Sequence, residues 1–178
     1  SIALPSLKVD RNTLPIIETV SNLRKSSLTF AVESASDELR NISNKKVRRD
    51  DLFEIVDYVF NHGWRMIKLY FMIGLPGCGE VDEAEEIISL LKEIVRRGRG
   101  KKDINVTISP FVPKPHTPFD HEKQMGMDYF HDVIRKVKSA APRQVTIKNH
   151  DVRSSFLEGL LARGDDRAGS VIYNAYLG

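Results

Sequence analysis

Short apolar runs alternate along this chain with longer stretches in which apolar residues recur every three or four positions. The short runs are typical of buried strands and the longer stretches of amphipathic helices. Strands are predicted at residues 2–9, 27–33, 64–73, 104–111 and 144–148. Helices are predicted from about residue 12, at 36–40, 50–62, 82–97 and 129–140, and as a helix–loop–helix within 151–178. Strands separated by helices of this length predict parallel β/α units, and therefore an α/β fold.

Charged and small residues mark the ends of two of these helices. Asp50 is expected to cap one helix, and Gly63 follows its last residues. The helix 82–97 begins with Asp82 and three glutamates, ends with two arginines, and is followed by Gly98. Acidic residues at the start of a helix and basic residues at its end complement the helix dipole.

Composition narrows the class of protein. The 178 residues are 41% hydrophobic and 29% charged, with a net charge of +3, which suits one domain with a core. The single cysteine, Cys78, excludes an internal disulfide framework and a metal site built from several cysteines of this chain. That usage fits a reducing, cytoplasmic compartment. Neither a signal peptide nor an apolar run near the roughly 18 residues of a membrane span is present.

Two polar pairs follow the second predicted strand. Glu33 and Ser34 end that strand, where a carboxylate can accept hydrogen bonds from the vicinal hydroxyls of a ribose. The alternative is a solvated glutamate beside serines that cap the next helix. Asn44 and Lys45 lie within a basic stretch, NISNKKVRR. That stretch is either a solvated loop or a loop with one lysine turned inward to pair with a ligand carboxylate.

Glycines follow the third strand in YFMIGLPGCGE. Gly74 and Gly77 allow the backbone to approach a flat ligand, and Pro76 stiffens the turn. Turns of this kind are common after strands, so this motif is weakly specific by itself. Cys78 lies in the same loop with no histidine beside it in the sequence, which makes an incidental thiol the default interpretation.

A proline-rich segment, SPFVPKPHTPF, follows the fourth strand. Its prolines exclude a helix and favour a rigid extended path. Phe111 and Val112 can form an apolar wall for a purine, and His116 or Thr117 a polar contact; a stiff connector is the alternative. The chain has neither a G-x-x-x-x-G-K-[ST] nor a G-x-G-x-x-G motif, and its histidines lack the spacing of a zinc site.

Taken in order, these motifs resemble the second half of the barrel of radical S-adenosylmethionine (radical SAM) enzymes. The likeness is greatest to an uncharacterised bacterial group whose radical SAM core often accompanies cobalamin-binding-like and radical-SAM-linked domains. The resemblance implies that residues 1–148 form about strands 3 to 6 of a partial TIM-like (β/α)6 barrel with their helices. Residues 149–178 would then be a truncated helical segment that follows the barrel.

The resemblance also implies roles for single residues in S-adenosylmethionine binding. Glu33 corresponds to a polar residue that bonds the ribose or the methionine part. Lys45 corresponds to a basic residue, often arginine, that pairs with the methionine carboxylate; lysine lacks the bidentate fork of arginine. Tyr70 replaces an aspartate that binds ribose in some relatives, and Ser34 is expected to take over that role.

The adenine contacts are implied in the same way. Gly74 and Leu75 correspond to a turn whose backbone lies along adenine, and Phe111, Val112 and Pro113 to residues that line its pocket. The CxxxCxxC motif, which holds a [4Fe–4S] cluster in that family, is missing here, and Cys78 cannot replace it. The cluster ligands are therefore expected in the parent protein only, before Ser1, and this fragment alone is expected to be inactive.

Expected partners follow from these interpretations. A half barrel has an open strand edge, so the rest of the parent chain or a homodimer is expected at the exposed barrel edge. No membrane partner is expected. The alternative function is a basic α/β module that binds nucleic acid or a protein partner through the basic runs 45–49 and 96–102. Neither run contains the aromatic residues expected for single-strand recognition.

Overall fold

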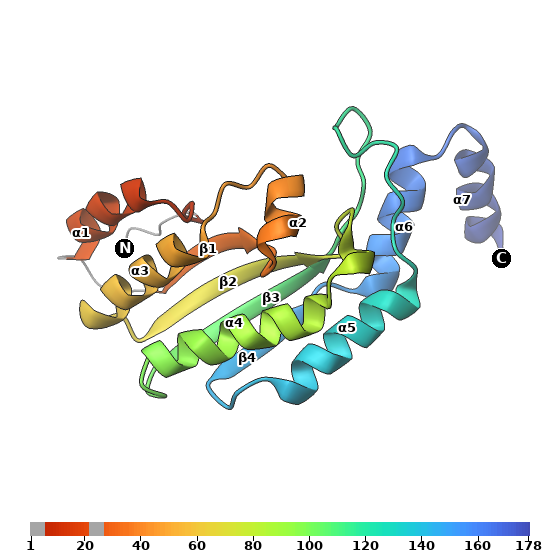
Figure 1. Ribbon diagram of the computed structural model, residues 1–178. Helices are drawn as coiled ribbons and strands as arrows, with labels where there is room; N and C mark the ends of the chain where they lie inside the picture. The colour runs from red at the N-terminus through yellow and green to blue at the C-terminus, as the bar shows by residue number, and fades with distance from the viewer. Residues whose placement is uncertain (1–5, 22–26) are drawn as a thin grey trace.

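Four parallel strands form one sheet, and they lie in it in the order in which they occur in the chain. The computed structural model describes residues 6–21 and 27–178 (Figure 1). Within these residues the protein is α/β, as the sequence predicts. The strands are β1 (Leu28–Glu33), β2 (Met66–Ile73), β3 (Asp103–Pro110) and β4 (Val145–Asn149).

Helices connect the strands, and seven α-helices occur in the described part of the chain. Most lie where the periodicity of apolar residues predicts them. They are α1 (Leu14–Ser21), α2 (Asp37–Ile42), α3 (Arg49–Asn61), α4 (Glu83–Arg97), α5 (Met127–Ala140), α6 (Val152–Arg163) and α7 (Arg167–Leu177). Two short 3-10 turns, η1 (Arg11–Thr13) and η2 (Cys78–Glu80), complete the elements.

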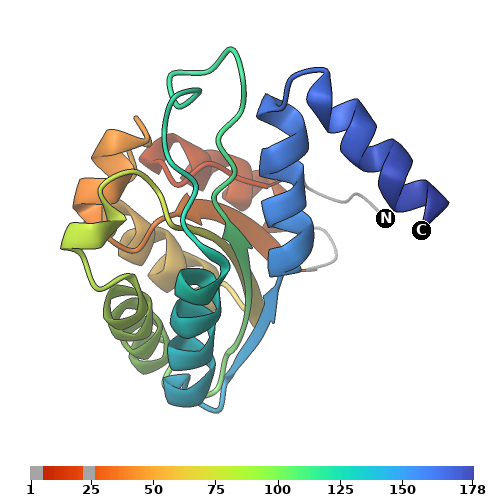
Figure 2. The same ribbon diagram turned by 90° about the vertical axis from the view of Figure 1, so that its right-hand side faces the viewer.

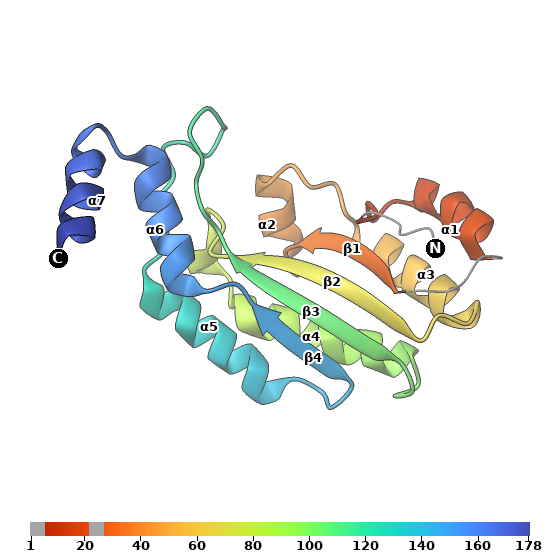
Figure 3. The same ribbon diagram turned by 180° about the vertical axis from the view of Figure 1, so that it is seen from behind.

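The two faces of the sheet differ. Alternate residues of β1, β2 and β3 are fully buried, and they form one core with α3, α4 and α5. Figure 2 shows these helices together on one side of the sheet. The other face carries half-buried or exposed side chains, and Figure 3 shows it with the strands toward the viewer. Its central row runs across β1 to β4 as Ala31, Tyr70, Thr107 and Lys148, which are paired in register.

Two predicted helix starts have different outcomes. The sequence predicts Asp82 as the first residue of its helix, and α4 begins one residue later, with Asp82 as its N-cap, whose side chain accepts a hydrogen bond from the Glu85 N–H at 3.1 Å. The prediction for Asp50 is wrong, because α3 begins at Arg49 and its N-cap, Arg48, makes no side-chain cap bond. Asp50 lies instead in the first turn, where its charge still complements the helix dipole.

The predicted first strand is described only in part, because residues 1–5 lie outside the described residues. Leu7 makes an isolated parallel bridge to Phe30 of β1, and its N–H donates to the Thr29 carbonyl at 2.7 Å. The chain before α1 therefore touches the free edge of β1, which continues the sequential order of the sheet.

The last two helices form the expected helix–loop–helix. Asp151 caps α6 by accepting a hydrogen bond from the Ser154 N–H at 2.7 Å. Val152, Ser155 and Gly159 of α6 are buried, whereas α7 has no buried residue. Among the described helices none combines the length and the apolar character needed to cross a bilayer.

Candidate functional site

The carboxyl ends of β1, β2 and β3 lie at one end of the sheet, together with α2 and the proline-rich segment (Figure 1). Because the strands are parallel, the segments that follow them emerge side by side, and ligands of parallel α/β sheets bind at this end. The candidate residues Glu33, Gly74 and Phe111 are the last residues of their strands or follow them directly. The fold therefore brings three sequence motifs to one edge.

Glu33 and Lys45 form an ion pair at this edge. The Lys45 Nζ donates to Glu33 Oε1 at 2.9 Å, and both side chains remain about a quarter exposed, at 29% and 27%. Glu33 lies just after a register shift in the β1–β2 pairing and has φ +67°. A non-glycine residue in this region is strained, and such strain clusters at functional sites. Asn44, with φ +51°, turns the chain so that Lys45 reaches back to the strand.

The buried side chain of Arg40 joins the loop that follows Glu33 to the loop that follows Lys45. Its side chain is 1% exposed, and it donates to the Val47 carbonyl at 2.9 Å and to the Ser34 carbonyl at 2.6 Å. A third contact is an ion pair with Asp37. Burial lowers the pKa of Arg40 to about 10, and the nearby Arg49 adds to the effect. The guanidinium thus links the residues after Glu33 to the residues after Lys45.

A buried carboxylate fixes the glycine-containing turn after β2. Glu83 is 4% exposed, and its Oε2 accepts from the Gly74 N–H at 2.7 Å and from the Tyr129 hydroxyl at 2.7 Å. Gly74 has φ +79°, and a Cβ there would lie 2.6 Å from Phe130 Cε1. Packing against α5 and the backbone angle therefore both require glycine at this position, independently of any ligand.

Burial perturbs the titrating groups around this turn. Desolvation raises the pKa of Glu83, although the hydrogen bonds from Gly74 and Tyr129 oppose it. Desolvation is also the main cause of a raised pKa for the Cys78 thiol and for the Tyr129 phenol. Cys78 is 4% exposed, so its thiol is a packed side chain, and burial disfavours its thiolate form.

Most residues that were expected to contact adenine have buried side chains, which a purine ring could not reach. Leu75 and Phe111 are 2% and 4% exposed and pack in a small cluster with Leu39 and Cys78. Phe119 contacts the Phe111 ring edge-on, with centroids 5.6 Å apart. Pro113 is buried as well, and Val112 is half-buried. Among the residues expected around adenine, only Val112 is not buried.

Ser34 and Tyr70 lie in different surroundings. Ser34 is 3% exposed, and its Oγ accepts from the Ser36 N–H at 3.2 Å, so its side chain shapes the loop. Tyr70 is 38% exposed on the open face of the sheet, in the row described above. A ribose contact by either residue stays a prediction.

Sequence reasoning missed Arg40, Glu83 and Tyr129. Arg40 looked like an ordinary helix arginine, and its carbonyl acceptors carry no sequence signal. Glu83 looked like one of several acids at the start of α4. The available signal was its spacing of nine residues from Gly74. A loop of that length lets the first turn of α4 fold back onto the end of β2, where Glu83 can accept from the Gly74 N–H.

Most of the charged side chains in the basic runs 45–49 and 96–102 form ion pairs or hydrogen bonds within the chain. Arg97 pairs with Asp57 and Glu93, and Arg49 pairs with Glu86 at 3.6 Å. Lys102 donates to two backbone carbonyls. Among the described residues no group of three or more His, Cys, Asp or Glu side chains is arranged to hold a metal ion.

The comparisons with known proteins identify a relative. No protein-family model matches the chain. Over 150 residues the chain is 30% identical to the uncharacterised protein MJ0966 of Methanocaldococcus jannaschii, and the match covers 81% of this chain. It covers 31% of the relative, so the chain spans about a third of that protein's length.

Proposed function

We propose that this chain is part of a radical SAM enzyme and supplies the ribose-, carboxylate- and adenine-contacting side of the S-adenosylmethionine site. The observation that carries the proposal is the Glu33–Lys45 pair beside the Gly74 turn, at the carboxyl end of a parallel sheet. A carboxylate on a residue with a strained backbone and a partly exposed ammonium together match a ligand that carries hydroxyls and a carboxylate.

The chemistry of the pair fits both ends of such a ligand. An ammonium has three N–H donors, and Lys45 uses one of them on Glu33, which leaves donors for a methionine carboxylate. The second oxygen of Glu33 remains as an acceptor for ribose hydroxyls. Arg40 keeps the two side chains together because it bonds to carbonyls in both loops. Adenine would lie along the backbone of residues 74–75 and against Val112.

The order of the strands supports a partial barrel as the finer architecture. Successive strands are neighbours, and their crossover helices α3, α4 and α5 share one face. In a doubly wound sheet the order reverses and helices cover both faces, whereas a barrel keeps one direction and leaves the inner face to a ligand. The polar row of Tyr70, Thr107 and Lys148 would line that interior.

The [4Fe–4S] cluster does not fit this chain. Cluster ligands are several cysteine thiolates, and this chain has one cysteine, buried with a raised thiol pKa. The proposal therefore assigns cofactor binding to these residues and assigns the cluster and the chemistry to other parts of a longer protein.

A titration with S-adenosylmethionine tests the proposal. We expect weak binding by the isolated chain, in the millimolar range, since half of the site is supplied elsewhere. Lys45→Ala should weaken it about fivefold, as expected for a partly exposed ion pair worth on the order of 1 kcal/mol. Lys46→Ala removes the same charge from the exposed neighbouring residue and should leave the affinity unchanged. Equal effects of the two variants, or absent binding at 10 mM ligand, a concentration about tenfold above a millimolar dissociation constant, would contradict the proposal.

A further inference from the structure

The α6–α7 hairpin carries an unusual concentration of exposed apolar side chains. Of the thirteen large hydrophobic residues that are exposed in the described chain, nine lie between residues 156 and 177. Scattered exposed hydrophobic residues are normal, but a contiguous patch of this kind marks an interaction surface. None of these residues belongs to the proposed cofactor site.

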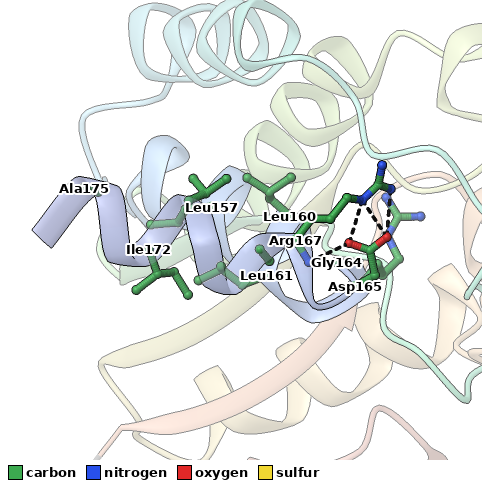
Figure 4. Close-up of a pocket in the computed structure, with 11 residues that line it drawn as sticks. Leu157, Leu160, Leu161, Gly164, Asp165, Arg167, Ile172 and Ala175 are labelled. Atoms are coloured by element: carbon green, nitrogen blue, oxygen red, sulfur yellow. Dashed lines mark hydrogen bonds and ion pairs between the residues drawn. The ribbon is translucent and has the colours of Figure 1, made fainter.

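The two helices enclose an apolar groove. It has a volume of about 660 Å³ and is lined mainly by Leu157, Leu160 and Leu161 of α6 and by Val171 and Ile172 of α7. Figure 4 shows leucines of α6 and Ile172 of α7 along it, with the Asp165–Arg167 ion pair at one end. The leucines lie opposite the side of α6 that carries the buried residues Val152, Ser155 and Gly159.

The outer side of α7 is apolar as well. Tyr173, Tyr176 and Leu177 are 62%, 84% and 64% exposed and lie away from the groove residues. Its polar side carries Ser170 and Asn174, so the groove side and the outer side are both apolar and both exposed, and an isolated helix of eleven residues is marginal in water. Both sides of α7 therefore require cover that the described chain does not supply.

Charge favours a neutral, apolar partner. Residues 168–178 contain no charged side chain. At the end of the groove Arg167 pairs with Asp165 at 2.7 Å, and Arg163 donates to the carbonyls of Asp120 and Glu122. The charged residues of the groove are confined to this end, so its apolar length offers an acidic or basic partner no counter-charge, whereas an identical apolar surface would meet no repulsion.

We infer that the hairpin is a self-association surface between two copies of this chain. In the dimer, α7 of each copy lies in the α6–α7 groove of the other. Such a contact is isologous, so one two-fold axis closes the dimer. The nine residues are each between 41% and 84% exposed. Aromatic side chains present roughly 150–250 Å² each and aliphatic ones somewhat less, so these exposed fractions together amount to on the order of 900 Å². That area matches the roughly 800 Å² per partner of a stable interface. This contact is separate from the open sheet edge and from the proposed cofactor site.

Sedimentation velocity of the full chain at about 5–200 μM, a range that brackets a micromolar dissociation constant, tests this inference. We expect a dimer that is insensitive to salt between about 50 and 500 mM, because screening acts on charge and not on apolar contact. Leu160→Glu, in the groove, and Tyr176→Ser, on the outer side of α7, should each shift the dissociation constant at least tenfold toward the monomer. Ile16→Glu places the same new charge at an exposed apolar residue of α1, 51% exposed, and should leave the dimer intact.

Circular dichroism and urea midpoints of each variant separate loss of contact from loss of fold. A wild-type chain that stays monomeric overturns the inference. The same holds for a monomeric chain that binds neutral phosphatidylcholine vesicles or an apolar dye, because the groove would then serve a different ligand. A dimer that persists in both hairpin variants would place the contact elsewhere, at the sheet edge for example, and would contradict it equally.

Discussion

The buried carboxylate of Glu83 should make the stability of this protein depend on pH in a specific direction. Burial raises the pKa of Glu83 in the folded chain above its ordinary value of 4.5. A raised folded pKa means that the stabilising contribution is complete below the unfolded pKa and is lost as the pH rises through the folded pKa. Glu83→Gln does not titrate, so its stability relative to wild type should increase between pH 4 and neutral pH.

The size of the effect follows from the contacts. Each pH unit between the folded and unfolded pKa values corresponds to about 1.4 kcal/mol of unfolding free energy. Glu83→Ala is a different perturbation, because it leaves the Gly74 N–H and the Tyr129 hydroxyl without their acceptor. A buried donor without a partner costs about 1–3 kcal/mol, so the loss of an acceptor for two donors should cost this variant about 2–6 kcal/mol near pH 4. The loss should become smaller toward neutral pH, because the wild type itself is destabilised there by its buried carboxylate.

Urea unfolding at several pH values between about 4 and 8, spanning the ordinary carboxylate and histidine pKa values, measures both effects. Glu80→Gln removes the same charge at an exposed residue of the neighbouring turn, and it should show no comparable pH-dependent gain. If the difference between Glu83→Gln and wild type stayed constant or fell with rising pH, the account of Glu83 as a desolvated carboxylate would be wrong. If Glu83→Ala unfolded like wild type, the two hydrogen bonds would not hold the turn.

Three further changes test the local structure, each by urea unfolding. Gly74→Ala should cost about 1–3 kcal/mol, because its φ is +79° and its Cβ would meet Phe130 at 2.6 Å; a neutral result would contradict the glycine requirement. Arg40→Met should cost about 3 kcal/mol, since the carbonyls of Ser34 and Val47 lose their buried donor, and it should also weaken S-adenosylmethionine binding. Asp82→Ala should cost about 1 kcal/mol through loss of the α4 cap, and an unchanged midpoint would argue against that cap.

The periodicity of apolar residues was sufficient to predict most of the fold. The strands and the helix α4 lie within one or two residues of their predicted bounds, because each buries one face against the same core. The cap of α3 was predicted at the wrong residue, since aspartate is a favoured cap residue and Arg48, which makes no side-chain cap bond, carries no such signal in the sequence.

The candidate site was less predictable than the strands that carry it. Its location at the strand ends follows from parallel topology, but the exposure of Phe111 depends on Leu39 of α2 and on Phe119, which pack over it from elsewhere in the chain. Arg40 was missed for a similar reason, because its acceptors are backbone carbonyls, which every residue has.

Backbone amide chemical shifts recorded during addition of S-adenosylmethionine test the central claim most directly. The account predicts that the largest shift changes occur at Glu33, Lys45, Gly74 and Val112, and that they saturate together with one dissociation constant. Residues of the α6–α7 hairpin should not respond. Shift changes confined to other regions, or a spectrum unchanged at saturating ligand, would contradict the proposal that this end of the sheet binds the cofactor.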